Sequence, residues 1–173
     1  MQKSIKRTVA IRVVAVLVST LLFSFMTTFN IFRIQATQAM ASQANALLDR
    51  AEKAETAHYK WVTNLSNALY AGTEFTGSID PSTCVLGQWL YGEAGTDDQD
   101  ILALRSQLEP LHKELHESAT YVLDLLKTDP QAATSYFQET IHGNLGTLVG
   151  LLDQVIERSS ALSQESAAEM ENT

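Results

Sequence analysis

The hydrophobic pattern of the chain begins with one long apolar run. Residues 13–32 carry no charged side chain, and Arg12 and Arg33 flank the run. At ~1.5 Å per residue, a helix of this length spans about 30 Å, which is the thickness of the hydrocarbon core of a bilayer. The run therefore predicts a single transmembrane helix.

A cleaved signal peptide is the main alternative for this run. Ala39-Met40-Ala41 has the small residues of a cleavage site. The run is, however, longer than the ~7–15 apolar residues of a signal-peptide core, and the cleavage site lies well beyond its end. A buried core helix is also disfavoured, because both faces are apolar. An uncleaved membrane anchor is the favoured interpretation.

Beyond the span, apolar residues recur at steps of three and four over three segments, as expected for amphipathic helices. Residues 34–70 contain neither Pro nor Gly and are predicted to continue the span as one long helix, which Gly72 ends. Residues 101–126 form a second long helix. Pro110 removes one backbone hydrogen bond from it and predicts a kink.

The last helix is predicted to begin near Gln131. The Thr-Asp-Pro sequence directly before it ends the preceding helix, and it offers an aspartate that can cap the next helix and a proline suited to its first turn. Its apolar pattern ends at Val155, and the sequence turns polar after Glu157. We expect the helix to fray there and to leave residues 161–173 as a polar tail.

A shorter helix is predicted between the first two long ones. The Gly- and Pro-containing loop 73–81 precedes it, and Ser82 or Thr83 can cap a helix that runs to Leu90. Three long amphipathic helices and one short helix predict an all-α four-helix bundle after the N-terminal transmembrane helix. We expect residues 51–160 to form this bundle.

Charge is distributed unevenly along the chain. The formal net charge is −8, but four of the 12 basic residues precede the span, so residues 33–173 hold the other eight together with all 20 acidic residues. The positive-inside rule then places the tail 1–12 in the cytoplasm and the acidic domain outside, in the periplasm of a Gram-negative cell. Residues 33–50 would connect the two as a helix. An acidic domain also argues against nucleic-acid binding.

Four residues carry candidate metal chemistry: Cys84, His58, His112 and His116. Cys84 is the only cysteine, which excludes an intramolecular disulfide. His112 and His116 are four residues apart and share one face of their helix. One thiolate and three imidazoles can fill the tetrahedral shell of a closed Zn²⁺ site.

Each of these residues also has a purely structural interpretation. Histidine pairs at this spacing arise by chance, and Lys113 stands where a hydrolytic zinc motif has glutamate. Taken alone, His58 is better explained as a core histidine with one hydrogen bond, and Cys84 can be a small buried hydrophobe. The predicted place of Cys84 near a helix N-terminus favours a functional thiol, because backbone N–H groups lower the pKa of a thiolate there. His142 is interpreted as a surface residue.

The sequence around these residues resembles the chemoreceptor zinc-binding (CZB) domain family. The resemblance rests on His-Tyr-Lys-Trp from His58, on Cys-Val-Leu-Gly-Gln-Trp-Leu-Tyr-Gly from Cys84, and on the spacing of His112 and His116. It covers about residues 50–160. It implies a four-helix bundle, usually a homodimer, that holds one zinc ion per subunit through the three histidines and the cysteine.

The resemblance also implies roles for neighbouring residues and for the whole domain. Packing residues rather than ligands would be Trp61, Gly87, Trp89, Leu90 and Tyr91. In the family, metal occupancy or oxidation of the zinc-bound cysteine regulates chemoreceptors or diguanylate cyclases. The resemblance therefore predicts a sensory domain, not an enzyme, that acts on a downstream signalling protein or an output module. The members that we know best carry the domain in the cytoplasm, whereas the basic tail here predicts the outside.

Two other classes of function are the alternatives to a zinc sensor. A metal-independent helical bundle that senses a small ligand fits the same helix pattern. A zinc enzyme would need an open metal position, which four protein ligands do not leave.

Overall fold

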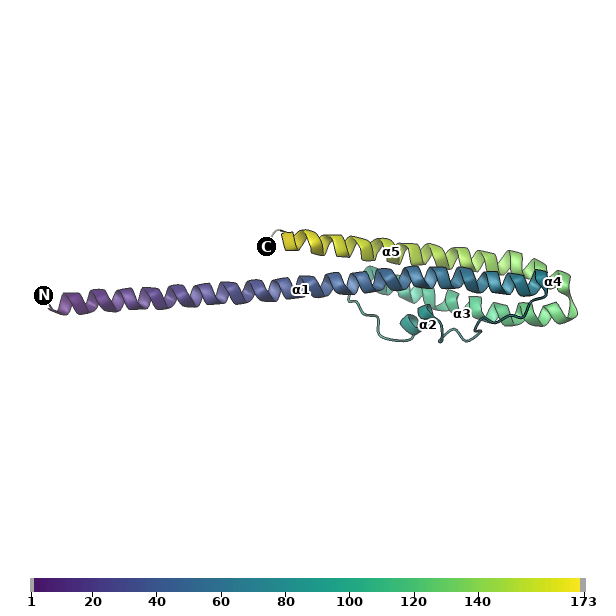
Figure 1. Cartoon of the computed structure of the whole chain (residues 1–173), viewed down its shortest axis with the longest axis horizontal. Helices are drawn as coiled ribbons and strands as arrows, with labels where there is room; N and C mark the ends of the chain where they lie inside the picture. The colour runs from purple at the N-terminus through teal and green to yellow at the C-terminus, as the bar shows by residue number, and fades with distance from the viewer. Residues whose placement is uncertain (1, 172–173) are drawn as a thin grey trace.

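The computed structural model describes residues 2–171, with side chains from residue 5 onward. Its elements are α1 (Gln2–Ala71), α2 (Val85–Leu90), α3 (Gln99–Thr128), α4 (Pro130–Tyr136), the π-helical turn η1 (Phe137–Ile141) and α5 (His142–Glu171). The last three follow one another directly and form the third long helical segment (Figure 1). The predicted all-α class, with three long helices and one short one, is confirmed.

Helix α1 is one continuous helix of 70 residues that runs from the apolar N-terminal segment into the bundle. It ends at Ala71 because Gly72 has a φ of 66°, a conformation that glycine adopts without strain. The N-terminal part of α1 projects beyond the other helices, and its C-terminal part packs against them (Figure 1). The prediction that the apolar segment continues into the domain as one helix is confirmed.

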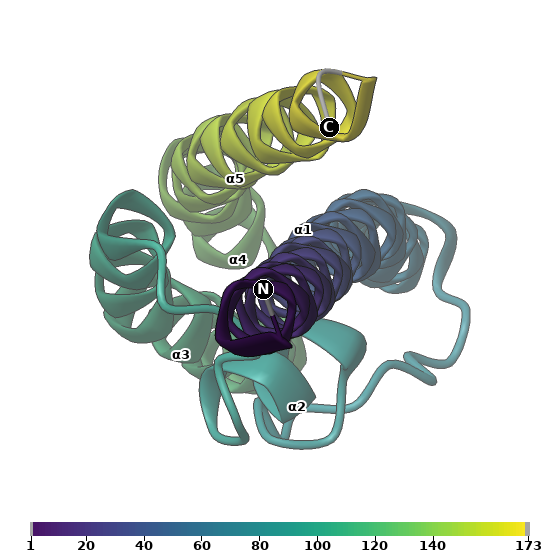
Figure 2. The same ribbon diagram turned by 90° about the vertical axis from the view of Figure 1, so that its left-hand side faces the viewer.

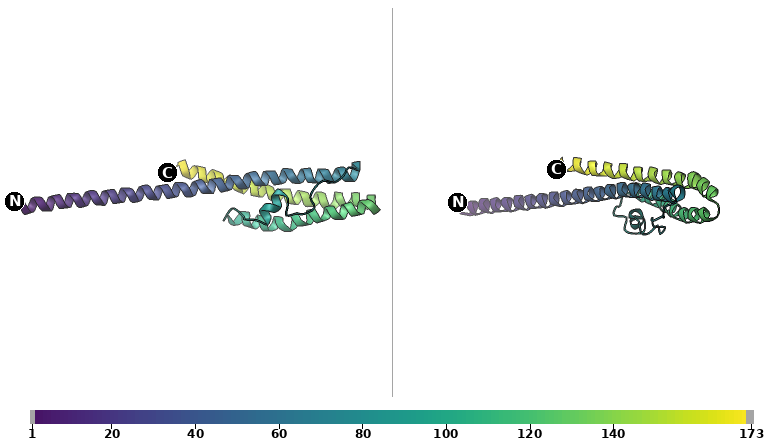
Figure 3. Two further views of the ribbon diagram at one scale, coloured as in Figure 1. Left: turned by 60° about the horizontal axis from the view of Figure 1, so that its bottom comes forward. Right: turned by 45° about the vertical axis from the view of Figure 1, so that its right-hand side comes forward.

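The bundle forms around the C-terminal part of α1. Helices α3 and α5 lie beside it, and α2 with its flanking loops lies on the side of α1 away from α5 (Figures 2 and 3). The apolar stripes predicted from the sequence face inward, and the largest fully buried side chains include Trp89, Phe137, Leu65 and Leu86. Burial of this apolar surface is the main force that holds the four helices together.

Two aspartates begin the later helices. Asp129 caps α4, with Pro130 in its first turn, as the sequence predicted. Asp98, which the sequence analysis did not single out, caps α3 by accepting a hydrogen bond of 3.0 Å from the Ile101 N–H. Its second carboxylate oxygen accepts from Arg158 of α5 at 2.7 Å. Asp98 therefore ties the start of α3 to the middle of α5.

Helix α5 extends further than the sequence predicted. The expectation of fraying after Glu157 is wrong, because the helix continues to Glu171. Ser159 and Ser166 are buried, and the Ser163 hydroxyl donates a hydrogen bond of 2.9 Å to the Asn45 side chain of α1. Small polar residues allow two helices to approach closely, so α5 keeps packing along α1 after its apolar stripe has ended.

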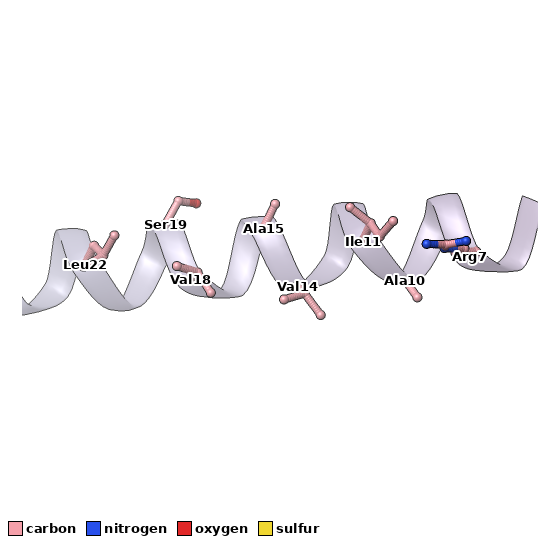
Figure 4. Close-up of a pocket in the computed structure, with 8 residues that line it drawn as sticks. All are labelled: Arg7, Ala10, Ile11, Val14, Ala15, Val18, Ser19 and Leu22. Atoms are coloured by element: carbon pink, nitrogen blue, oxygen red, sulfur yellow. The ribbon is translucent and has the colours of Figure 1, made fainter.

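The apolar N-terminal part of α1 has a different environment. Its large side chains are exposed, for example 70% for Leu21 and 71% for Phe23. The residues labelled in Figure 4, from Arg7 to Leu22, project from a single helix. Soluble proteins rarely expose an apolar surface of this size. Among residues 2–171, α1 is the one helix whose length and composition fit a membrane span.

Candidate metal centre

The four candidate residues meet in the bundle from three separate elements. His58 lies on α1, Cys84 directly precedes α2, and His112 and His116 lie on α3. Their candidate ligand atoms all lie within 4.8 Å of one another. The Cys84 Sγ is 3.1 Å from Nε2 of His112 and 4.0 Å from Nε2 of His58. Ligands of a tetrahedral zinc ion lie roughly 3.3–3.6 Å apart, given Zn–N and Zn–S bonds of about 2.0–2.3 Å.

Two backbone carbonyls orient the imidazole rings. Nδ1 of His58 lies 2.7 Å from the Ala54 carbonyl oxygen, and Nδ1 of His116 lies 3.1 Å from the Ser78 carbonyl oxygen. A carbonyl can only accept, so each Nδ1 carries the proton and donates it. Nε2 of each ring is then left with a lone pair, which points toward the site. This is the usual arrangement of a histidine that binds a metal.

Unpaired polar atoms show that these residues fit a metal. Nε2 of His116 and Nδ1 of His112 are buried without a hydrogen-bond partner. The three histidines are at most 2% exposed. A buried polar atom without a partner costs free energy, and a cation that accepts the Nε2 lone pair of His116 would remove that cost at this ring. Nε2 of His112 faces the Cys84 thiol, so a metal there would leave Nδ1 of His112 as an N–H without a partner. The donor set of one sulfur and three nitrogens matches the preference of zinc.

The histidines are held in the form that binds metals. Burial, together with the neighbouring histidines, lowers the pKa of His112 to about 3. Burial and the proximity of His58 lower the pKa of His116 to about 4. Burial also lowers the pKa of His58. All three imidazoles are therefore neutral at neutral pH, and only a neutral imidazole can donate a lone pair.

Two predictions about Cys84 and its surroundings are wrong: the cap of α2 and the pKa of the thiol. Neither Ser82 nor Thr83 caps α2, because Cys84 itself is the cap, and its Sγ accepts a hydrogen bond of 3.2 Å from the Gly87 N–H. The pKa of the thiol is raised rather than lowered, because burial outweighs the backbone N–H groups of Gly87 and Leu86. The helix N-terminus alone therefore does not produce a thiolate.

Gly87 is required by close packing. A Cβ atom at this position would overlap the carbonyl oxygen of Pro81, in the turn that leads to Cys84. The absence of a side chain lets α2 approach this turn, and the Gly87 N–H then reaches the thiol. The glycine of the Cys-Val-Leu-Gly sequence thus sets the position of Cys84.

A family comparison agrees with this geometry. Residues 58–123 match the family model described as the chemoreceptor zinc-binding domain, CZB. This segment of the chain is a CZB domain. The match begins at His58 and includes all four candidate ligands, and zinc is the metal that the domain binds. Neither the curated proteins nor the solved structures gave a match to the chain. The boundaries 51–160 expected for the bundle stay a prediction.

The predicted packing residues of the CZB domain divide into two groups. Trp89 is 2% exposed and donates from Nε1 to the Ala94 carbonyl at 2.8 Å, and Gly87 and Leu90 are also buried. Trp61 donates to the Ser78 carbonyl, the oxygen that also orients His116. These residues support the site as expected. Tyr91 does not, because 46% of it is exposed.

Arg105 is a positioning residue that the sequence analysis missed. Its guanidinium donates to the carbonyl oxygens of Trp89, Leu90 and Gly92, at distances between 2.6 and 3.2 Å. The last carbonyls of a helix lack partners within the helix, and a cation there is favourable. Arg105 therefore fastens α2, the short helix that Cys84 caps, to α3, which carries two of the histidines. The sequence analysis could not predict this contact, because Arg105 and the carbonyls that it binds are 13 to 16 residues apart and no local pattern links them.

We expect Arg105→Gln to weaken both folding and zinc binding. The loss of charged hydrogen bonds should cost about 1.5–3 kcal/mol of unfolding free energy. The loosened α2 should lower zinc affinity by about 10- to 100-fold, which is typical when a residue that orients a metal ligand is substituted. Urea unfolding and zinc competition with a chromophoric chelator measure the two effects.

The matched control for Arg105 is Lys113→Gln on the same helix. Lys113 forms only an exposed pair with Glu117 at 3.7 Å, so its loss should change stability by less than about 0.5 kcal/mol. Equal effects of the two substitutions would contradict the role assigned to Arg105.

The metal-free CZB domain is expected to lose stability on acidification. The pKa values of His112 and His116 are about 3 and about 4 in the folded chain, against about 6.5 for a histidine in an unfolded one. Between pH 6.5 and about 4, the unfolded chain binds protons that the folded chain does not. The free energy of unfolding should therefore decrease as the pH is lowered, by up to about 1.4 kcal/mol per pH unit for each proton that only the unfolded chain binds.

Urea unfolding of chelator-treated protein between pH 7.5 and 5 measures this slope. His112→Gln should reduce it, and His142→Gln, at an exposed site, should not. A wild-type stability that does not change over this range would show that the buried histidines accept protons without cost.

Proposed function

We propose that this protein is a membrane-anchored sensory or regulatory protein that binds Zn²⁺ through His58, Cys84, His112 and His116. The observation that carries the proposal is the convergence of these four donors in one buried group, in which Nε2 of His116 has no hydrogen-bond partner. Zinc bound there would supply positive charge that stabilises the Cys84 thiolate and joins three helical elements. The protein contributes the fixed orientation of the rings and the exclusion of water.

A regulatory role is favoured over a catalytic one by the number of donors. Catalytic zinc sites keep one position for water or substrate, and they use three protein ligands. Here four donors lie within reach of one centre. We therefore propose that the site does not catalyse a reaction.

The proposed signal path follows α1 to the membrane. His58 lies 25 residues after Arg33, which corresponds to about 38 Å of uninterrupted helix between the site and the proposed span. Loss of zinc would allow α1 and α3 to shift relative to each other, and a rigid helix transmits such a shift. Helix α5 is coupled to the same part of α1 through the bond between Ser163 and Asn45.

The proposed orientation places the N-terminus in the cytoplasm and the zinc domain in the periplasm. Its support is the cluster of basic residues before the span and the acidic domain after it. Fusions of alkaline phosphatase and of green fluorescent protein to the C-terminus test it. Phosphatase activity without fluorescence is expected, and the reverse pattern would contradict the orientation.

The proposed stimulus is zinc itself or an oxidant that attacks the Cys84 thiolate, such as hypochlorous acid. Oxidation to the sulfenic acid removes the charge of the thiolate and would loosen the metal. Sulfenic-acid trapping at low oxidant dose, with and without zinc, tests this variant, and a thiol that stays unlabelled counts against it. We further propose a homodimer that acts on a downstream signalling protein in a chemotaxis or cyclic-di-GMP system.

Metal analysis by mass spectrometry tests the core of the proposal. The gently purified chain is expected to carry about one zinc ion per molecule. Less than about half a zinc ion, with no difference between wild type and Cys84→Ala, would refute it.

Zinc uptake is expected to release about one proton per metal ion at pH 7. The histidines are already neutral, and burial holds the pKa of the Cys84 thiol above its usual range, so only the thiol has a proton to lose. Calorimetry of zinc binding in buffers of different ionisation enthalpy measures the number of protons released per zinc ion. In Cys84→Ser the release should fall toward zero, and a release of two or more from the wild type would show that histidines are protonated before zinc binds.

A further inference from the structure

A small cavity opens to the surface directly over the metal centre. Three of the four candidate ligands line it, and the remaining lining residues are Ala57, Trp61, Ser78 and Thr83. Its volume is about 190 Å³. At ~30 Å³ per molecule this corresponds to about six waters, and it is below the ~300 Å³ at which pockets hold drug-sized ligands.

The cavity reaches the site from the side of the thiol. Cys84 is the only one of the four candidate ligands that is not fully buried. His112 does not line the cavity and is 0% exposed, so it lies on the inner side of the site. A solute that enters the cavity therefore meets Cys84 before it meets His112.

Hydrogen bonds hold the walls of the cavity in place. The Trp61 Nε1 donates to the Ser78 carbonyl at 2.8 Å, and the hydroxyls of Ser78 and Thr83 lie 2.9 Å apart. The Thr83 hydroxyl also donates to the Asp80 carbonyl at 2.9 Å. Ser78 and Thr83 thus line the cavity from a turn that hydrogen bonds hold together, and Ala57 lines it from α1. These hydrogen bonds therefore restrict how far the walls of the cavity can move apart.

We propose that this cavity is the access channel of the metal centre, and that Ala57 limits the size of the solutes that reach Cys84. The channel would admit a metal ion with part of its hydration shell and uncharged molecules of a few heavy atoms, and it would exclude groups larger than the cavity itself, such as a dansylamidoethyl group. For the metal ion, this inference rests on the zinc-binding function proposed above. Access to the thiol is a property of the metal-free fold and can be measured without zinc.

Two thiol reagents of different size test the channel on the metal-free full-length protein in detergent. The Cys84 thiolate attacks the sulfenyl sulfur of methyl or dansylamidoethyl methanethiosulfonate, forms a mixed disulfide and expels methanesulfinate. Both reagents need the same thiolate and release the same group, so the ratio of their rates reports access alone. The ratio of the methyl rate to the dansylamidoethyl rate is expected to be at least about tenfold higher in the folded protein than in urea.

A matched pair of substitutions tests the role of Ala57. Ala57→Leu places bulk in the cavity and should slow the methyl reagent by about tenfold or more. Thr56→Leu adds similar bulk at the neighbouring exposed position, which does not line the cavity, and should leave the rate within about twofold. Circular dichroism tests whether each variant is folded. If Ala57→Leu does not fold, the ratio of the two reagent rates in the wild type still tests the channel.

Two results would overturn the channel. Equal ratios of the methyl and dansylamidoethyl rates in folded and unfolded protein would mean that local unfolding, which admits both reagents, exposes Cys84. A folded Ala57→Leu with unchanged rates would mean that solutes arrive by another path.

Zinc kinetics separate the channel from the proposed function. Ala57→Leu should slow zinc association and zinc release to a chelator by the same factor and leave Kd unchanged, because Ala57 is not a ligand. An altered Kd with unchanged association would contradict the channel. A wild type that binds no zinc would refute the proposed function, and the thiol rates would still decide the channel.

Discussion

Cys84→Ala is expected to lower zinc affinity by roughly 100- to 1000-fold. Structural four-ligand sites bind zinc with about 10–16 kcal/mol, and the loss of one ligand of four removes about a quarter of it. His112→Ala should act similarly, because this histidine lies 3.1 Å from the thiol and is fully buried. Competition with a chromophoric chelator measures the affinities at a fixed pH.

The chain provides its own control for this prediction. His142 is an exposed histidine outside the site, and His142→Ala should bind zinc as the wild type does. Zinc should also raise the unfolding temperature of the wild type and of this control, but not that of Cys84→Ala at the same zinc concentration. If His112→Ala kept full zinc affinity, stability and signalling response, the metal-independent ligand-binding bundle would be the better description.

Gly87→Ala is expected to be the most disruptive substitution of a residue that does not bind the metal. The added Cβ would overlap the Pro81 carbonyl oxygen and lie within 3.0 Å of the Cα of Ser82. Backbone atoms cannot rotate away as a flexible side chain can, so α2 must move, and Cys84 must move with it. We expect a loss of about 2–4 kcal/mol in unfolding free energy and a large loss of zinc affinity.

A second glycine gives the opposite expectation. Gly143 lies on α5 with open space where a Cβ would be placed, so Gly143→Ala should stabilise the protein by up to about 1 kcal/mol through helix propensity. Urea unfolding of both variants and zinc titration of Gly87→Ala measure these effects. A Gly87→Ala variant with wild-type stability and affinity would show that α2 can move away from the turn without moving the thiol.

Periodic patterns explain why most of the fold was predictable from the sequence. The long helix from the apolar run to Ala71 follows from the absence of Pro and Gly and from the stop at Gly72. The start of α4 follows from the aspartate and proline at its N-terminus. These signals are local, because helix periodicity and capping depend on residues within a few turns of one another.

Interactions between distant segments explain where prediction was wrong. The polar sequence after Glu157 predicted fraying, but α5 remains helical because α1 continues beside it. The helix N-terminus predicted a lowered thiol pKa, but the surrounding bundle buries Cys84 and raises it. In both cases a neighbour that is remote in the sequence outweighs the local preference.

The sequence by itself determined which donors this protein can offer a metal and that two of them share one helix face. Spacing within a helix follows from covalent geometry, so His112 and His116 needed no tertiary information. The tertiary structure decided the rest: it brought His58 and Cys84 to that face, used the Ser78 and Ala54 carbonyls to orient two rings, and fastened α2 with Arg105. These contacts exist only when the bundle closes, and burial by helices from different parts of the chain then keeps the histidines neutral at acidic pH as well.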